Sequence, residues 1–231
     1  MPSSQYELCQ EVLRRLRDEG ALERLVLVGS WCLLLYRDYF KGVGPVHAVK
    51  TRDMDFLILP PASKRPSINI PLVLDDLGFI SSFRGSEGYL MLQHPELMIE
   101  FLVPERGRGE RGARDIPELG VNAQPLRFMD IPLMMLAEFM FGDIRIKAPH
   151  PVAFCLHKLL ICGRRSNEEK RLKDLRDSLN VLDLIAKKGD SDLVYDLFKK
   201  FPLPWQKTIA ALLRNHGRAE VLSPGLGYHN D

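Results

Sequence analysis

Two aspartates inside an apolar strand constrain this chain more than any other feature. Asp53 and Asp55 lie in residues 52–59 (RDMDFLIL), which are otherwise mainly apolar. In a strand, residues i and i+2 point to the same face, so the two carboxylates would lie side by side with Met54 turned to the core. Close carboxylates repel each other, and a divalent cation is the usual means of keeping both ionised. The strand therefore predicts a metal site.

A glycine and a serine follow an earlier apolar run at residues 25–28. Gly29 permits a tight turn and a close approach of the backbone to a ligand. Ser30 is the predicted N-cap of a helix over residues 31–40, whose free N–H groups favour an anion such as phosphate. An anion site beside a metal site predicts a place for a metal-bound nucleoside triphosphate.

A glutamate interrupts the predicted strand at residues 97–103 (LMIEFLV). Burying a lone carboxylate is costly, so either this face is exposed to solvent or Glu100 has a partner such as a metal ion. Beside Asp53 and Asp55, we favour the metal ion.

The order of these motifs along the chain is similar to that of a known protein family. An apolar run ending in Gly29 and Ser30, then a helix, then Asp53-x-Asp55 within an apolar strand resembles the nucleotidyltransferase fold of the DNA polymerase beta superfamily. Within it, the chain is similar to small prokaryotic nucleotidyltransferases of the abortive-infection and toxin–antitoxin type. Glu100 fits the third carboxylate that the resemblance implies. The spacer between the motifs is longer than the common family pattern and carries a loop at residues 41–51.

Two further residues take an expected role from the resemblance. Lys158 lies on a predicted apolar helix at residues 152–162. Such a lysine can snorkel to solvent or reach a triphosphate as a point charge, and the resemblance favours phosphate binding. Asp174 lies in the KDLRD segment of a predicted helix at residues 166–188, where the resemblance implies an aspartate that aligns the lysine. A surface lattice of salt bridges is the alternative for Asp174.

The expected fold is α+β, namely a nucleotidyltransferase fold with a mixed, mostly antiparallel sheet flanked by helices, followed by a C-terminal helical domain. We place the sheet domain at residues 1–149, the helical domain at 150–222 and a flexible tail at 223–231. Residues 104–123, rich in Arg and Gly, predict a loop. Residues 143–146 predict a last edge strand, and the Met-rich segment 126–141 predicts core packing.

Charge and composition exclude some classes of protein. The net charge of +2 indicates no strong general attraction to nucleic acid or to a membrane. No apolar run approaches the roughly 18 residues of a membrane span, and the N-terminus lacks the layout of a signal peptide, so we expect a cytoplasmic protein. None of the four cysteines forms a C-x-x-C pair, which favours reduced, buried thiols.

Residues and resemblance together predict a nucleotidyltransferase that uses Mg²⁺ or Mn²⁺. It would move a nucleoside monophosphate from a nucleoside triphosphate to a hydroxyl acceptor and release pyrophosphate. The acceptor stays open between a protein, an RNA and a small molecule, and a partner protein stays an open alternative. A second hypothesis is a non-catalytic module of the same fold that binds a nucleotide or a partner. A metal-dependent phosphohydrolase ranks last, because it needs histidine ligands and only His47 is close to the aspartates in sequence.

Overall fold

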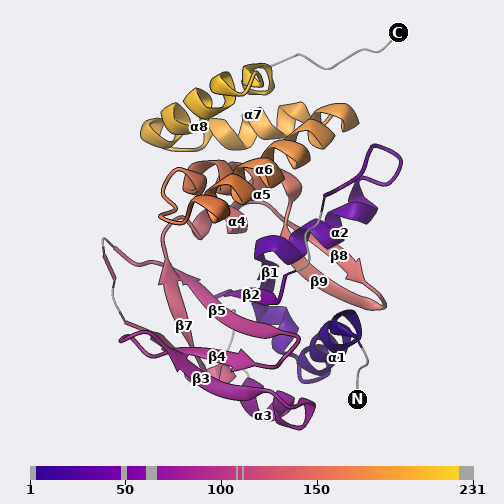
Figure 1. Cartoon of the computed structure of the whole chain (residues 1–231), viewed down its shortest axis with the longest axis vertical. Coiled ribbons are helices and arrows are strands. Elements are labelled where there is room, and N and C mark those ends of the chain that lie inside the picture. The colour runs from indigo at the N-terminus through magenta and orange to yellow at the C-terminus, as the bar shows by residue number, and fades with distance from the viewer. Residues whose placement is uncertain (1–3, 48–50, 61–66, 108, 111, 224–231) are drawn as a thin grey trace. The chain divides into compact units, whose positions relative to one another are not determined.

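The computed structural model describes residues 4–47, 51–60, 67–107, 109–110 and 112–223 (Figure 1). The chain divides into two compact units. Unit 1 comprises Met1–Leu35, Val49–Asp130 and Ala137–Ala148, and unit 2 comprises Tyr36–Ala48, Ile131–Leu136 and Pro149–Asp231. Apart from Ser223, the predicted tail lies outside the described residues.

A mixed sheet lies mainly in unit 1. Within the described residues its strands are β1 Leu25–Val28, β2 Asp53–Ile58, β3 Ile80–Arg84, β4 Tyr89–Gln93, β5 Met98–Pro104, β6 Arg114–Ile116, β7 Val121–Leu126, β8 Leu136–Phe141 and β9 Ile144–Pro149. The main path runs β3-β4-β5-β2-β1-β9-β8, with β7 beside β5 and β6 beside β7. β2 is antiparallel to β1 and parallel to β5. A mixed sheet with flanking and C-terminal helices confirms the predicted fold class.

The described residues form eight α-helices, of which the first is amphipathic. The described helices are α1 Gln5–Asp18, α2 Cys32–Tyr39, α3 Ile70–Leu74, α4 Asp130–Met134, α5 Pro151–Cys162, α6 Glu168–Lys188, α7 Ser191–Lys199 and α8 Leu203–Asn215. The Ser4 hydroxyl caps α1 by accepting the Glu7 N–H at 3.2 Å. The buried stripe of α1 contains Leu8, Val12 and Leu16, and the helix contacts α3 of the same unit.

The strand that carries the aspartates alternates as predicted. Met54 and Phe56 are buried, whereas Asp53 is exposed and Asp55 is half-buried. Phe56 stacks on Phe101 of β5 with ring centroids 6.3 Å apart, so the apolar face of β2 and β5 is anchored in the core. This anchoring fixes which face carries the carboxylates, because a one-residue slip would bury them.

Unit 2 is built around α5, which contacts α6, α7 and α8. The helix is apolar on almost every side, as expected for a helix surrounded by others. Tyr36 joins the segment Tyr36–Ala48 to this unit by donating its hydroxyl to the Pro149 carbonyl at 2.7 Å.

Three local expectations were wrong. Residues 104–123 contain β6 and part of β7, and β7 pairs in parallel with β5. The strand predicted at 143–146 is β9, which lies between β1 and β8 and is therefore not an edge. In the Met-rich segment, Met129 is buried but Met134 and Met140 are 45% and 49% exposed. The strands within residues 104–123 and the internal position of β9 both depend on pairing with strands that are distant in sequence. Local composition does not reveal such partners.

None of the described helices has the length and apolar character that crossing a membrane would require.

Candidate functional site

Two neighbouring strands of unit 1 bring the predicted carboxylates together. Asp55 of β2 is the register partner of Glu100 of β5, and Asp53 is the partner of Met98. Register partners on adjacent strands point to the same face, so Asp53, Asp55 and Glu100 share one face of the sheet. Asp53 and Asp55 lie roughly 7 Å apart along the strand, given its rise per residue.

The Gly29-Ser30 turn lies directly against Asp55. β1 ends at Val28, which pairs with Asp55, and Gly29 follows with φ +74°. A Cβ atom built on Gly29 would lie 2.5 Å from Asp55 Oδ2. Ser30 is not the predicted N-cap, because it lies inside the short 3-10 turn Gly29–Trp31 that leads into α2. The backbone needs the left-handed conformation to turn this sharply, and the turn displaces the cap position.

We expect Gly29→Ala to destabilise unit 1 and to displace Asp55. The new methyl group would collide with the Asp55 carboxylate, and the left-handed φ alone costs on the order of 1 kcal/mol for a residue other than glycine. Urea unfolding measures the loss. Gly88→Ala is the matched control, because Gly88 also has a positive φ (+68°) but no atom within 4 Å of the added methyl group. Equal losses in both variants would contradict the close approach to Asp55.

Glu100 has a partner that the sequence analysis missed. Arg84 of β3 donates from Nη1 to Glu100 Oε1 at 2.9 Å, and the Glu100 side chain is 18% exposed. Glu100 therefore has a partner, as one of the two predicted explanations required, but in this structure the partner is Arg84 and not the favoured metal ion. No local signal in the sequence indicates this pair, because Arg84 reaches Glu100 only through the pairing of β3 with β4 and of β4 with β5.

The donor set suits a hard divalent cation. Three carboxylates on one face are the oxygen ligands that Mg²⁺ accepts. In their present conformations, no three His, Cys, Asp or Glu side chains among the described residues form a group that could hold a metal ion. Glu100 would have to turn from Arg84 to join Asp53 and Asp55. The three carboxylates therefore suit a metal ion in their chemistry, whereas their present conformations do not form its site.

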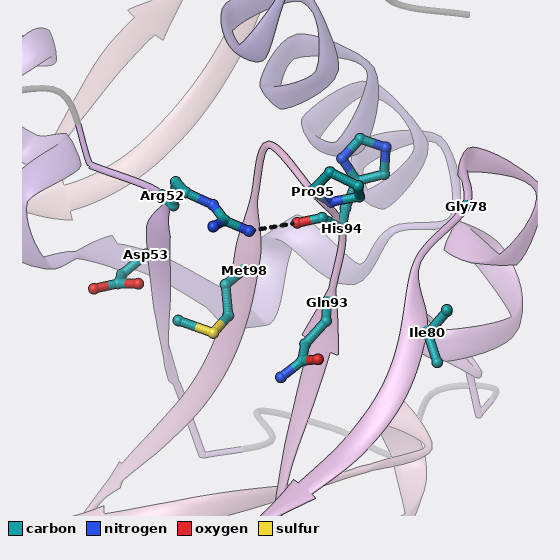
Figure 2. Close-up of a pocket in the computed structure, with 8 residues that line it drawn as sticks. All are labelled: Arg52, Asp53, Gly78, Ile80, Gln93, His94, Pro95 and Met98. Carbon is teal, nitrogen blue, oxygen red and sulfur yellow. Dashed lines mark hydrogen bonds between the residues drawn. The ribbon is translucent and has the colours of Figure 1, made fainter.

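A pocket opens on the carboxylate face next to Asp53 (Figure 2). Its volume is about 540 Å³, and its lining residues are Arg52, Asp53, Gly78, Ile80, Gln93, His94, Pro95 and Met98. Four of these form a row across four strands, since Asp53 pairs with Met98, Met98 with Gln93, and Gln93 with Ile80. The row lies roughly 7 Å along the strands from the Asp55–Glu100 pair.

The predicted lysine and aspartate of the helical segment meet inside unit 2. Lys158 Nζ on α5 forms a buried ion pair with Asp174 Oδ1 on α6, and Arg165 Nε donates to Asp174 Oδ2 at 2.9 Å. Burial alone would raise the pKa of Asp174, but Lys158 and Arg165 together lower it. The Lys158 and Asp174 side chains are only 8% and 6% exposed, so the surface lattice of salt bridges does not describe this pair.

Comparison with family models and solved structures gives the class of protein. Residues 7–218 match the model of a family described as nucleotidyltransferase. The chain belongs to this nucleotidyltransferase family. No curated protein matches this nucleotidyltransferase.

Solved structures similar to this nucleotidyltransferase share little sequence with it. An antigenic nucleotidyltransferase-like protein from Paracoccidioides brasiliensis is 14% identical, covers 100% of both chains and has a TM-score of 0.50. ANT(2")-Ia in complex with adenylyl-2"-tobramycin is 12% identical, with a TM-score of 0.47 over 92% of this chain and 98% of the other. A solution structure of ANT(2'')-Ia, an antibiotic-resistance factor, has a TM-score of 0.42 at 12% identity over 94% of this chain and 99% of the other. The first of these likenesses supports the fold.

Two buried polar groups of the nucleotidyltransferase lie near Lys158 without a hydrogen-bond partner. His157 Nε2 and both carboxylate oxygens of Asp177 are buried, and neither group has a hydrogen bond in the described structure. Burial raises the pKa of Asp177, against the attraction of Lys158, Lys173 and Arg176. Burial, reinforced by Lys158, lowers the pKa of His157 to about 3. Folded His157 is therefore neutral at all but strongly acidic pH.

We expect His157 to make the nucleotidyltransferase less stable in mild acid. An unfolded histidine takes up a proton below pH 6.5, whereas folded His157 does so only near pH 3. Between pH 6.5 and pH 3 the unfolded state therefore binds more protons than the folded state. The contribution of neutral His157 to the free energy of unfolding is complete above pH 6.5, and it falls by about 1.4 kcal/mol for each pH unit below that. Urea unfolding should show this slope flattened in His157→Leu and unchanged in His216→Gln, a variant of an exposed histidine. Parallel curves for wild type and His157→Leu would contradict it.

Proposed function

We propose that this nucleotidyltransferase moves a nucleoside monophosphate from a nucleoside triphosphate to a hydroxyl acceptor, with Mg²⁺ or Mn²⁺. One observation carries the proposal: Asp55 has Glu100 as its register partner and Gly29 against its carboxylate. The carboxylates proposed to bind the metal and the turn proposed to bind phosphate belong to one unit of a chain from a nucleotidyltransferase family, which supports the proposal.

Asp53, Asp55 and Glu100 are the proposed metal ligands. A divalent cation held there would neutralise charge on the triphosphate and lower the pKa of the acceptor hydroxyl. The backbone N–H groups of Gly29 and Ser30, in the 3-10 turn that leads into α2, would orient the phosphates. Orientation and charge neutralisation supply most of the rate in such reactions. Arg84 would release Glu100 when the metal site fills.

Lys158 and Asp174 keep their predicted roles as phosphate ligand and aligning residue, on the strength of the family resemblance. The buried ion pair between them supports an aligning role for Asp174. Kinship with toxin–antitoxin nucleotidyltransferases also stays a prediction.

A second function is favoured by the Arg84–Glu100 ion pair. If Arg84 holds Glu100 permanently, the site has lost its third carboxylate. The chain would then be a module that binds a nucleotide or a partner without turnover. Its nucleotide binding would depend little on a divalent cation.

Thermal unfolding with each of the four nucleoside triphosphates, with and without Mg²⁺ or Mn²⁺, separates these functions. We expect stabilisation by at least one triphosphate only when the metal is present, worth about 2.7 kcal/mol at roughly 100 times the dissociation constant. Asp53→Asn should remove the stabilisation. Asp143→Asn should keep it, because that carboxylate is 66% exposed at the turn between β8 and β9. Stabilisation that does not need the metal would favour the binding module.

A further inference from the structure

The pocket beside Asp53 lies on the opposite side of the carboxylates from the phosphate-binding turn. In the sheet, β2 and β5 carry the carboxylates, β1 with Gly29 lies to one side, and β4 and β3 lie to the other. The pocket row extends from Asp53 to Ile80 on β3 (Figure 2). The strand order therefore places it on the side away from Gly29.

The geometry of nucleotidyl transfer indicates what the β4 side of the carboxylates could bind. In nucleotidyl transfer the attacking and leaving oxygens lie roughly in line across the phosphorus. Under the proposed function, on which this inference rests, the leaving pyrophosphate is held at Gly29 and Ser30. The attacking hydroxyl must then approach from the β4 side of the carboxylates, where the pocket is.

The size of the pocket selects the class of acceptor. Pockets of roughly 300–1,000 Å³ bind small molecules, and this one measures about 540 Å³. Ile80, Pro95 and Met98 provide apolar surface, and Gln93 provides an amide. A compact molecule with one apolar side fits this lining.

The charges of the lining oppose a polyamine. Among the eight lining residues, all of them described, Asp53 is the single carboxylate, and the proposed function assigns it to the metal. Arg52 is then the remaining formal charge, with one guanidinium N–H used on the His94 carbonyl at 3.1 Å (Figure 2).

His94 also lines the pocket. Its Nδ1 accepts the Glu96 N–H at 3.1 Å, so the neutral ring carries its proton on Nε2. The ring lies against Phe79 with centroids 5.4 Å apart, which holds its orientation. The Arg52 guanidinium has further N–H groups besides the one bonded to the His94 carbonyl, and these can bind the oxygens of a carboxylate or a phosphate.

We infer that this pocket is the acceptor site, and that the acceptor is a small hydroxyl compound whose anionic group is bound by Arg52. In the transfer, the acceptor oxygen bonds to the α-phosphorus, the bond from that phosphorus to the bridging oxygen breaks, and pyrophosphate leaves with the electron pair. The hydroxyl proton passes to water. A polycationic aminosugar is disfavoured by the same lining.

Matched probes test the charge preference without turnover. Saturation-transfer NMR on the full chain compares glucose, glucose 6-phosphate, glucuronate, glucosamine and tobramycin. We expect binding of glucose 6-phosphate and glucuronate at least tenfold tighter than binding of glucosamine or tobramycin. Equal or tighter binding of the amines, or no binding of either anion, would overturn the inference.

Two variants locate the binding. Arg52→Gln should weaken binding of the anions at least tenfold. Ile80→Glu adds a carboxylate at a side chain that is 71% exposed, where folding tolerates it, and should reverse the preference toward glucosamine. Arg145→Gln is the control, because Arg145 is 72% exposed on β9. Anion binding that survives both pocket variants would place the anion elsewhere and overturn the inference.

Failure of this inference is distinguishable from failure of the proposed function. Metal-dependent stabilisation by a triphosphate reports the donor site alone. If a triphosphate still stabilises the chain in the presence of the metal but neither anionic sugar binds, the acceptor inference is wrong and the proposed transferase function is retained. If this stabilisation is absent while the anions bind through Arg52, the pocket is a binding site and the transferase proposal fails.

Discussion

Asp55→Asn should lower the rate of nucleotidyl transfer by on the order of 100-fold to 1,000-fold, the scale of losing one charge-stabilising group in an active site. Asp55 lies at the centre of the site, since it has Glu100 as its register partner and lies against Gly29. Asparagine keeps the shape of the side chain but removes the negative charge that a metal ion requires. Pyrophosphate release from the triphosphate that binds in the thermal assay measures the effect.

The control for Asp55→Asn separates chemistry from folding. Asp55 is half-buried, so circular dichroism and urea unfolding should first show that the variant is folded. Asp143→Asn, at an exposed carboxylate of the same unit, should release pyrophosphate at the wild-type rate. Retained transfer in folded Asp55→Asn would refute the assignment of this carboxylate.

Asp174→Ala should lower the free energy of unfolding by about 3–5 kcal/mol, the usual cost of removing one partner from a buried ion pair. The Lys158 ammonium would lose its carboxylate while remaining in a site where its side chain is 8% exposed. Arg165 should contribute less to the loss, because its side chain is 42% exposed and can turn to water. Urea unfolding gives the change directly.

A double variant and an exposed ion pair test whether the loss of stability comes from leaving the buried Lys158 charge without a partner. Lys158→Met combined with Asp174→Leu removes both charges and should recover most of the stability, since apolar side chains of similar size often replace buried pairs without loss. Glu138→Ala removes a partner of Arg145 from an exposed pair and should cost less than about 1 kcal/mol. A loss after Asp174→Ala no larger than that would show that the pair is effectively solvated.

Local pattern was enough to predict the strand that carries the aspartates. The alternation around Met54 fixed the face of Asp53 and Asp55, because only one register buries the apolar residues. The shared face with Glu100 followed once β5 paired with β2. The pairing of Lys158 with Asp174 came instead from the family resemblance, since sequence spacing alone also allowed a surface lattice.

Long-range pairing set the limit of the sequence analysis. Arg84 reaches Glu100 through the register of three strands, and a single residue of slip would have turned it to the other face. The pocket row from Asp53 to Ile80 has the same origin. Ser30 failed as an N-cap because the chain makes a 3-10 turn over Gly29–Trp31 before α2 begins.

The most direct test of the account is ³¹P NMR of the wild-type chain with a triphosphate, Mg²⁺ and a small-molecule extract from cells as the source of acceptor. We expect the triphosphate signals to decline while pyrophosphate and a new phosphodiester resonance grow together, and we expect Asp55→Asn to stop both changes. Release of inorganic phosphate without a phosphodiester would indicate a phosphohydrolase. No turnover of any triphosphate, with nucleotide binding that ignores the metal, would contradict the transferase and leave a binding module.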